Sequence, residues 1–181
     1  MKIYDCFSYW DEDLLLDLRL NILDSYVDYF VIVEGNKTWQ NNPKKLQFDI
    51  DKFKKFKEKI IYIPVDNMPD GDNPYVRENF QRNAISRGIE KAANEDFIII
   101  SDLDEIPNPK KIVSFKTKMR FAVFKQLHFY YKLNLQSQKN PYWYGSRICV
   151  KKYLKSPQWL RGLKFKKRPF WRIDKIRLNN I

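Results

Sequence analysis

Residues 97–107 read FIIISDLDEIP, an apolar run that leads into three acidic side chains and a proline. The run over residues 97–100 is short, continuous and rich in isoleucine, as in a parallel strand that is buried on both faces. In open α/β sheets, ligands bind beyond the carboxyl ends of the strands, where side chains face a crevice. We therefore expect Asp102, Asp104 and Glu105 to lie at a ligand-binding edge.

Upstream of this run, the pattern alternates between strands and helices. Apolar stretches predict strands at residues 3–8, 29–33 and 60–63. Leucines at i, i+4 and i+7 predict an amphipathic helix over residues 12–24, with Asp11 as its N-cap. Further helices are expected over 51–59 and from Arg77 onward, the second after a loop from Pro64 to Pro74. This alternation predicts an α/β fold with a mainly parallel sheet flanked by helices.

The sequence changes in character after Pro109. Residues 121–132 are aromatic and partly alternating, which predicts one or two antiparallel strands. From Lys151 the chain is basic with interleaved aromatic residues. We expect one domain over residues 1–150 and a basic aromatic extension, 151–181, that packs on it or trails from it.

Charge is distributed unevenly along the 181 residues. Residues 1–105 contain 14 Lys/Arg and 21 Asp/Glu, whereas residues 106–181 contain 20 Lys/Arg and one acid, Asp174. A basic half favours an anionic partner such as a nucleotide diphosphate, a nucleic acid or an anionic membrane surface. No apolar run approaches a membrane span, residue Asp5 interrupts any signal-peptide pattern, and two cysteines are too few for a disulfide scaffold. We expect a cytoplasmic protein.

The acidic cluster has a metal-binding interpretation and a simpler one. Asp102 and Asp104 are two residues apart, so in an extended segment they point the same way, and Glu105 adds a third carboxylate. Such oxygen ligands suit Mg²⁺ or Mn²⁺ and leave coordination positions for phosphates. The alternative is a solvated acidic turn. The position of the three carboxylates at the end of a buried strand favours the metal-binding interpretation.

Several segments together resemble glycosyltransferase family 17, in order and spacing, over about residues 1–150. They are residues 3–7, the leucine-rich helix, residues 30–34, Arg77-Glu78 with Gln81-Arg82, and residues 101–107. The resemblance implies a GT-A type nucleotide-sugar fold and an inverting transfer of a sugar, N-acetylglucosamine, from a metal-bound UDP-sugar to a glycan acceptor. It implies that Asp102 and Asp104 bind the metal, that Asp102 also contacts the donor, and that Arg77 and Arg82 lie near the nucleotide.

An inverting transfer also needs a general base for the acceptor hydroxyl. The chain lacks, before Ile181, the Gly-Trp-His-Phe-like segment into which family members continue. The base is then Glu105 or Asp174, with Glu105 favoured, unless the chain is a truncated version. His128, between aromatic residues, is more often structural in such a setting.

Three further residues are predicted to contact the donor because of their place at strand ends. Asp5 and Ser8 close the first strand, where the GT-A resemblance implies the nucleobase, and Glu34 ends the second strand at the same sheet edge as Asp102. For Glu34 a role in the turn is an equal alternative.

The basic aromatic extension leaves a second function open. It suits a peripheral contact with an anionic membrane surface or, less well, nucleic acid, and a compositional bias towards lysine explains it equally. The alternative function is therefore a catalytically incomplete nucleotide-sugar-fold module that binds through this extension.

Overall fold

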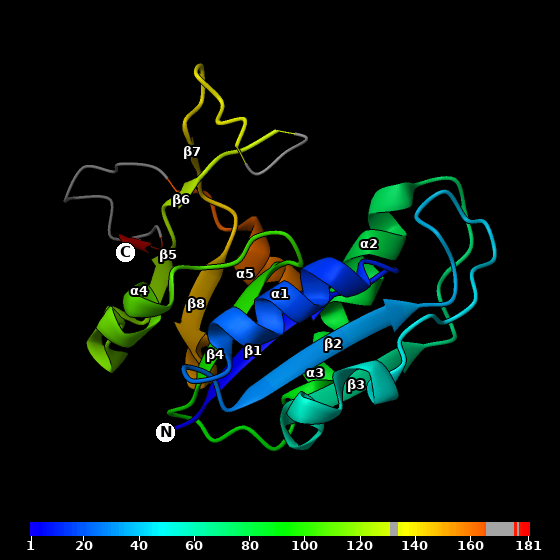
Figure 1. Cartoon of the computed structure of the whole chain (residues 1–181), viewed down its shortest axis with the longest axis horizontal. Coiled ribbons are helices and arrows are strands. Elements are labelled where there is room, and N and C mark those ends of the chain that lie inside the picture. Colours follow the sequence, from blue (N-terminus) through cyan, green and yellow to red (C-terminus); the bar gives the residue numbers. More distant parts are fainter. Residues whose placement is uncertain (131–133, 166–175, 177) are drawn as a thin grey trace.

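In the computed structural model of the protein, the described residues are 1–130, 134–165, 176 and 178–181. Its described part is an α/β fold with a mainly parallel seven-stranded sheet flanked by helices (Figure 1). The strands lie in the order β3-β2-β1-β4-β8-β5-β9. Their bounds are β1 Ile3–Ser8, β2 Tyr29–Gly35, β3 Ile60–Val65, β4 Phe97–Asp102, β5 Phe121–Val123, β8 Arg147–Val150 and β9 Asn179–Asn180.

The first four strands are parallel, and their order creates a switch point between β1 and β4. The chain passes outward from β1 to β2 through α1 (Asp13–Leu23), and to β3 through the 3₁₀ helix η1 (Ile50–Lys59). It then returns through α2 (Pro74–Asn83) and α3 (Ile85–Gly88) to β4, on the other side of β1. At such a point the flanking connections diverge and leave a crevice at the strand ends.

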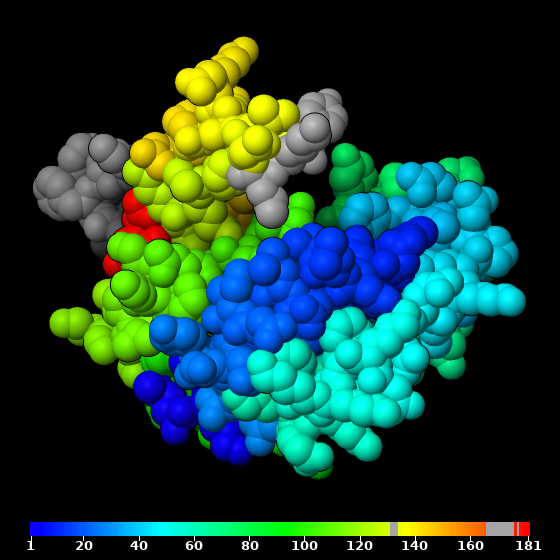
Figure 2. Space-filling model, viewed as in Figure 1, coloured from blue at the N-terminus to red at the C-terminus, as the bar shows by residue number. Residues whose placement is uncertain are grey.

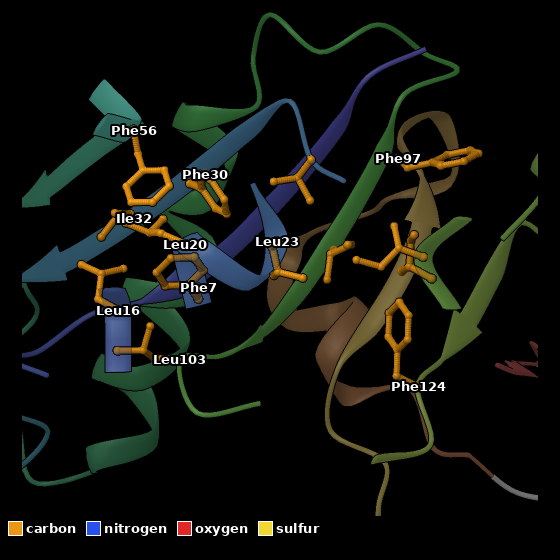
Figure 3. Packing of buried hydrophobic residues seen from close by; sticks show 14 of the residues in the cluster. Phe7, Leu16, Leu20, Leu23, Phe30, Ile32, Phe56, Phe97, Leu103 and Phe124 are labelled. Atoms are coloured by element: carbon orange, nitrogen blue, oxygen red, sulfur yellow. The ribbon is translucent and has the colours of Figure 1, made fainter. Parts of the chain in front are cut away.

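Helices cover both faces of the sheet and bury two apolar clusters. On one face, Leu16 and Leu20 of α1 pack against Phe7 and Phe30 of the strands (Figure 3). On the other face, Ile85 packs among Cys6, Val31 and Ile98. Successive strand residues thus alternate between the two clusters, and this explains why the strands are apolar throughout.

Most predicted elements of the amino-terminal half are confirmed, and three details are wrong. Asp11 is not the N-cap of α1: Glu12 occupies that position, and its carboxylate accepts hydrogen bonds from the amides of Trp10 and Asp11. The loop predicted from Pro64 starts later, because β3 is an edge strand and tolerates a proline. The helix predicted from Arg77 starts at Pro74, where the Asn73 side chain accepts from the Tyr75 amide.

The antiparallel strands predicted within residues 121–132 are confirmed as far as residue 130; residues 131–133 lie outside the described residues. The chain forms α4 (Pro109–Ser114) and the 3₁₀ helix η2 (Thr117–Met119), and then β5 and β8 pair antiparallel with each other and β8 with β4. Between them, β6 (Gln126–Leu127) and β7 (Tyr142–Trp143) form a separate hairpin. This part of the chain protrudes from the body of the molecule (Figure 2).

The first residues of the predicted extension pack on the sheet domain. The 3₁₀ helix η3 (Lys151–Tyr153) and α5 (Pro157–Gly162) follow β8 directly. Leu160 is fully buried, and Trp159 meets the Phe121 ring edge-on. Residues 166–175 and 177, which include much of the basic aromatic segment and Asp174, lie outside the described residues. Among the described helices, none is long and apolar enough to cross a membrane.

Candidate active site

A cavity of about 420 Å³ lies at the carboxyl ends of β1 and β4. It is at the switch point of the sheet, where Ser8 of β1 pairs in register with Asp102 of β4. Of the predicted site residues, Ser8, Asp102 and Asp104 line it. Trp10, Trp39 and Gln81 are among the other lining residues. The cavity therefore combines carboxylates with indole rings, a surface suited to a polar ligand with an aromatic base.

The acidic turn is fixed from beneath by Arg19, which sequence reasoning missed. Its guanidinium is fully buried and donates to the carbonyl oxygens of Asp102 and Leu103 at 3.0 and 2.9 Å. It also pairs with Asp5, whose two carboxylate oxygens lie 2.7 and 2.8 Å from its nitrogens. Asp5 was predicted to contact the donor, but the structure places it out of solvent beneath the turn, where it neutralises Arg19.

Asp102 is held between two arginines. One carboxylate oxygen lies 3.0 Å from Arg82 of α2, and the other lies 2.6 Å from Arg161 of α5. Burial opposes ionisation of Asp102, but attraction to Arg161 and Arg82 outweighs it and holds its pKa below the usual range. The side chain of Asp102 is nevertheless 43% exposed, so a ligand in the cavity can reach it.

Asp104 is exposed and lies in a field of like charge. Partial burial of its carboxyl, followed by the charges of Glu105 and Asp102, raises its pKa above the usual value. Neighbouring carboxylates repel one another, and a proton or a cation between them relieves this repulsion. Asp104 is therefore the carboxylate of the turn that is best placed to gain from an added cation.

Glu105 connects the turn to the protruding hairpin. One carboxylate oxygen accepts from the Trp143 indole nitrogen and from Arg161 at 2.7 Å, and the other accepts from the Asp102 amide at 3.1 Å. A general base must reach the acceptor's proton, whereas Glu105 is only 7% exposed and three protein donors hold its carboxylate. This geometry favours a positioning role for Glu105 over the predicted role as base.

Arg77 and Glu34 stabilise loops near the cavity and do not line it. The buried guanidinium of Arg77 donates to the carbonyl oxygens of Trp39 and Gly71, so it supports the loop that contains Trp39. The buried carboxylate of Glu34 bonds to Lys44, to the amides of Gln47 and Phe48, and to the Tyr62 hydroxyl. For Glu34 this arrangement corresponds to the predicted structural alternative.

His128 lies on the hairpin rather than in the cavity. Its ring centroid is 4.5 Å from that of Tyr130 and 5.4 Å from that of Trp143. Its Nδ1 lies 3.1 Å from the carbonyl oxygen of Asn140. These contacts correspond to the structural role expected of a histidine between aromatic residues.

The carboxylates of this site could hold a metal ion only together with oxygen atoms of a bound substrate. No group of three His, Cys, Asp or Glu side chains that could hold a cation occurs among the described residues. Mg²⁺ and related cations are often bound by one or two carboxylates together with substrate phosphates. Asp104 and Asp102, whose side chain is 43% exposed, fit that arrangement, because both line the cavity and could share a cation with ligand phosphates.

Comparisons with known proteins identify the family. The family model for glycosyltransferase family 17 matches residues 1–159, and the chain belongs to this family. Over 103 residues it is 31% identical to a human and to a rat protein, each named beta-1,4-mannosyl-glycoprotein 4-beta-N-acetylglucosaminyltransferase. The mouse protein of that name is 30% identical over the same length. Each match covers 51% of this chain and 19% of the relative's length.

Proposed function

We propose that the protein is a metal-dependent, inverting glycosyltransferase of GT-A type that uses a UDP-sugar. The sugar transferred is N-acetylglucosamine, and the acceptor is a glycan hydroxyl. The observation that supports this most strongly is the cavity at the switch point of the sheet, which Asp102 and Asp104 both line. Membership of glycosyltransferase family 17 and the names of the relatives support the reaction class and the sugar.

The residues of the cavity fit the parts of a nucleotide sugar. The indoles of Trp10 and Trp39 offer flat apolar surface to a uracil ring, and Ser8 offers a hydroxyl beside Asp102. Asp104, with the exposed side of Asp102, would hold Mn²⁺ or Mg²⁺. When bound, this cation supplies a Lewis acid that offsets charge on the departing diphosphate.

Two residues from outside the sheet position this machinery. Arg19 donates to backbone carbonyls of the turn and keeps Asp102 and Asp104 at the rim of the cavity. Glu105 links the turn to Trp143 of the hairpin, a residue that is 45% exposed. Exposed aromatic rings suit the apolar faces of sugars, so the hairpin is the expected contact for the acceptor glycan.

The alternative function is a binding module that does not transfer sugar. Of its proposed basic aromatic surface, Trp159 and Arg161 are already used in packing and in pairing with Asp102. Phe165 is stacked on Tyr144, with ring centroids 4.9 Å apart. These contacts favour the transferase.

A donor-turnover assay tests the proposal. UDP release from UDP-N-acetylglucosamine would be followed with and without Mn²⁺, with a panel of glycan acceptors, alongside UDP-glucose and UDP-galactose. We expect Mn²⁺-dependent release that Asp104→Asn abolishes and that the surface control Asp51→Asn leaves unchanged, because Asp51 is exposed on η1. Donor binding without any turnover would favour the binding module instead.

A further inference from the structure

The geometry points to an ion exchange at Asp102. Arg82 and Arg161 occupy its carboxylate in the free protein, and the donor's cation releases them to bind the diphosphate. This inference rests on the proposed function, because it concerns the same donor site. It assigns a ligand-binding role to Arg161 of α5, a residue that sequence reasoning placed in a basic extension.

Arg82 and Arg161, here called the arginine clamp, hold the Asp102 carboxylate from two sides. They approach Asp102 from different helices, α2 and α5, and contact different oxygens of one carboxylate. Both guanidinium groups are largely buried, with side chains 5% and 12% exposed. A guanidinium fork binds phosphate oxygens in the same way that it binds a carboxylate. Neither arginine lines the cavity, but both contact Asp102, which does, so a phosphate bound beside Asp102 would lie next to guanidinium donors.

One donor in the clamp is unused. The Nε of Arg82 is buried and has no hydrogen-bond partner in the described part of the chain. Its Nη2 bonds to both Glu78 and Asp102. A buried polar donor without a partner costs free energy, so a ligand that supplies an oxygen there gains affinity.

The charges explain why a diphosphate alone is not expected to enter. Five carboxylates lie at the cavity or on its arginines, those of Glu12, Glu78, Asp102, Asp104 and Glu105, and three guanidinium groups lie near them, those of Arg82, Arg147 and Arg161. This leaves an excess of two negative charges. A divalent cation would neutralise this excess, and a cation on Asp102 would also remove the acceptor that engages both arginines.

A third guanidinium, that of the partly buried Arg147, lies near the two arginines of Asp102. Burial, followed by repulsion from Arg161, lowers the pKa of Arg147 to about 10. Guanidinium groups that repel one another at a shared site favour an added anion. Cation and diphosphate should therefore strengthen each other's binding, and linkage requires the two effects to be equal.

Calorimetric titration of the full chain tests the exchange, with Mn²⁺ alone, UDP alone, and UDP in the presence of Mn²⁺. In the wild type, each ligand should raise the affinity for the other by about 5–150-fold, the usual range of coupling. Arg161→Gln should bind Mn²⁺ alone at least about fivefold more tightly, because Asp102 loses a competitor, and UDP with Mn²⁺ at least about fivefold more weakly. Arg87→Gln, the same change at an exposed arginine, should leave both affinities unchanged.

A second variant keeps the test decisive if Arg161→Gln does not fold. Asp102→Asn should lose the Mn²⁺ effect and bind UDP alone more tightly than the wild type, since both arginines are released. Parallel loss of both affinities in Arg161→Gln, or no change in either, would overturn the exchange and leave the donor site standing. Failure of the wild type to bind UDP with Mn²⁺ would overturn the donor site and the exchange with it.

Discussion

The guanidinium of Arg19 and the carboxylate of Asp5 form a fully buried ion pair, with both side chains 0% exposed and a nitrogen–oxygen distance of 2.7 Å. The pair lies directly beneath the acidic turn, because the same guanidinium donates to the carbonyl oxygens of Asp102 and Leu103. The first strand and first helix thereby set the position of residues that follow them by more than 80 positions.

Removing one partner of this pair should destabilise the whole domain. Asp5→Asn keeps the shape of the side chain but leaves the charge of Arg19 buried without compensation, which costs about 3–5 kcal/mol. Urea unfolding would measure the loss. As a control, Glu95→Gln breaks the exposed pair with Lys152 and should cost less than about 1 kcal/mol. Equal costs for the two variants would contradict the assigned importance of the buried pair.

Glu105→Gln separates a positioning role from a catalytic one. As a connector, Glu105 holds Arg161 and Trp143, so the variant should melt at a lower temperature and bind the donor more weakly. The shape of the pH–rate profile should not change. A base would behave differently: kcat would fall by about 10²–10⁴ with donor affinity unchanged. Steady-state kinetics over a pH range, together with thermal melting, distinguish these results.

The contact between Trp143 and Glu105 depends on the absence of a side chain at Gly145. A Cβ there would lie 1.8 Å from the Glu105 carboxylate and 2.2 Å from the Trp143 indole nitrogen. Gly145→Ala should therefore push the hairpin away and cost about 1–3 kcal/mol through overpacking. Gly162→Ala meets nothing within 4 Å and serves as the matched control. Thermal melting and tryptophan fluorescence report the change, and equal melting temperatures for both variants would refute this account.

Both cysteines should be unreactive in the folded protein. Burial raises the pKa of the Cys6 thiol and raises that of Cys149 to about 12, so little thiolate exists near pH 8. We expect a thiol reagent to label them only after unfolding. Since the pKa of each thiol is higher in the folded state, their contribution to stability declines as pH rises above about 9. Fast labelling of the native protein would contradict this.

The sequence was sufficient for the strands and for the acidic turn because these are local patterns. Continuous apolar runs fit only a sheet covered on both faces, and residues 97–100 led to Asp102 and Asp104 by their position alone. The contacts of those carboxylates were not predictable, because they involve residues distant in the chain.

Arg19 and Arg161 show which long-range contacts the sequence indicates and which it does not. Arg19 lies on the apolar face of α1, together with Leu16, Leu20 and Leu23. A charged residue on a buried helix face indicates a buried partner of opposite charge. The sequence therefore contains a signal for the buried position of Arg19. Arg161 gave no comparable signal, since it is one of many basic residues after Lys151 and only the packing of Leu160 brings it to Asp102.

Thermal melting with nucleotide sugars is the most direct test of the donor site. A ligand at about 100 times its Kd stabilises the folded state by about 2.7 kcal/mol, which for a domain of this size raises Tm by about 5–10 °C. We predict such a rise for UDP-N-acetylglucosamine with Mn²⁺, and its loss in Asp104→Asn. An unchanged Tm with every nucleotide sugar, with and without Mn²⁺, would contradict the account.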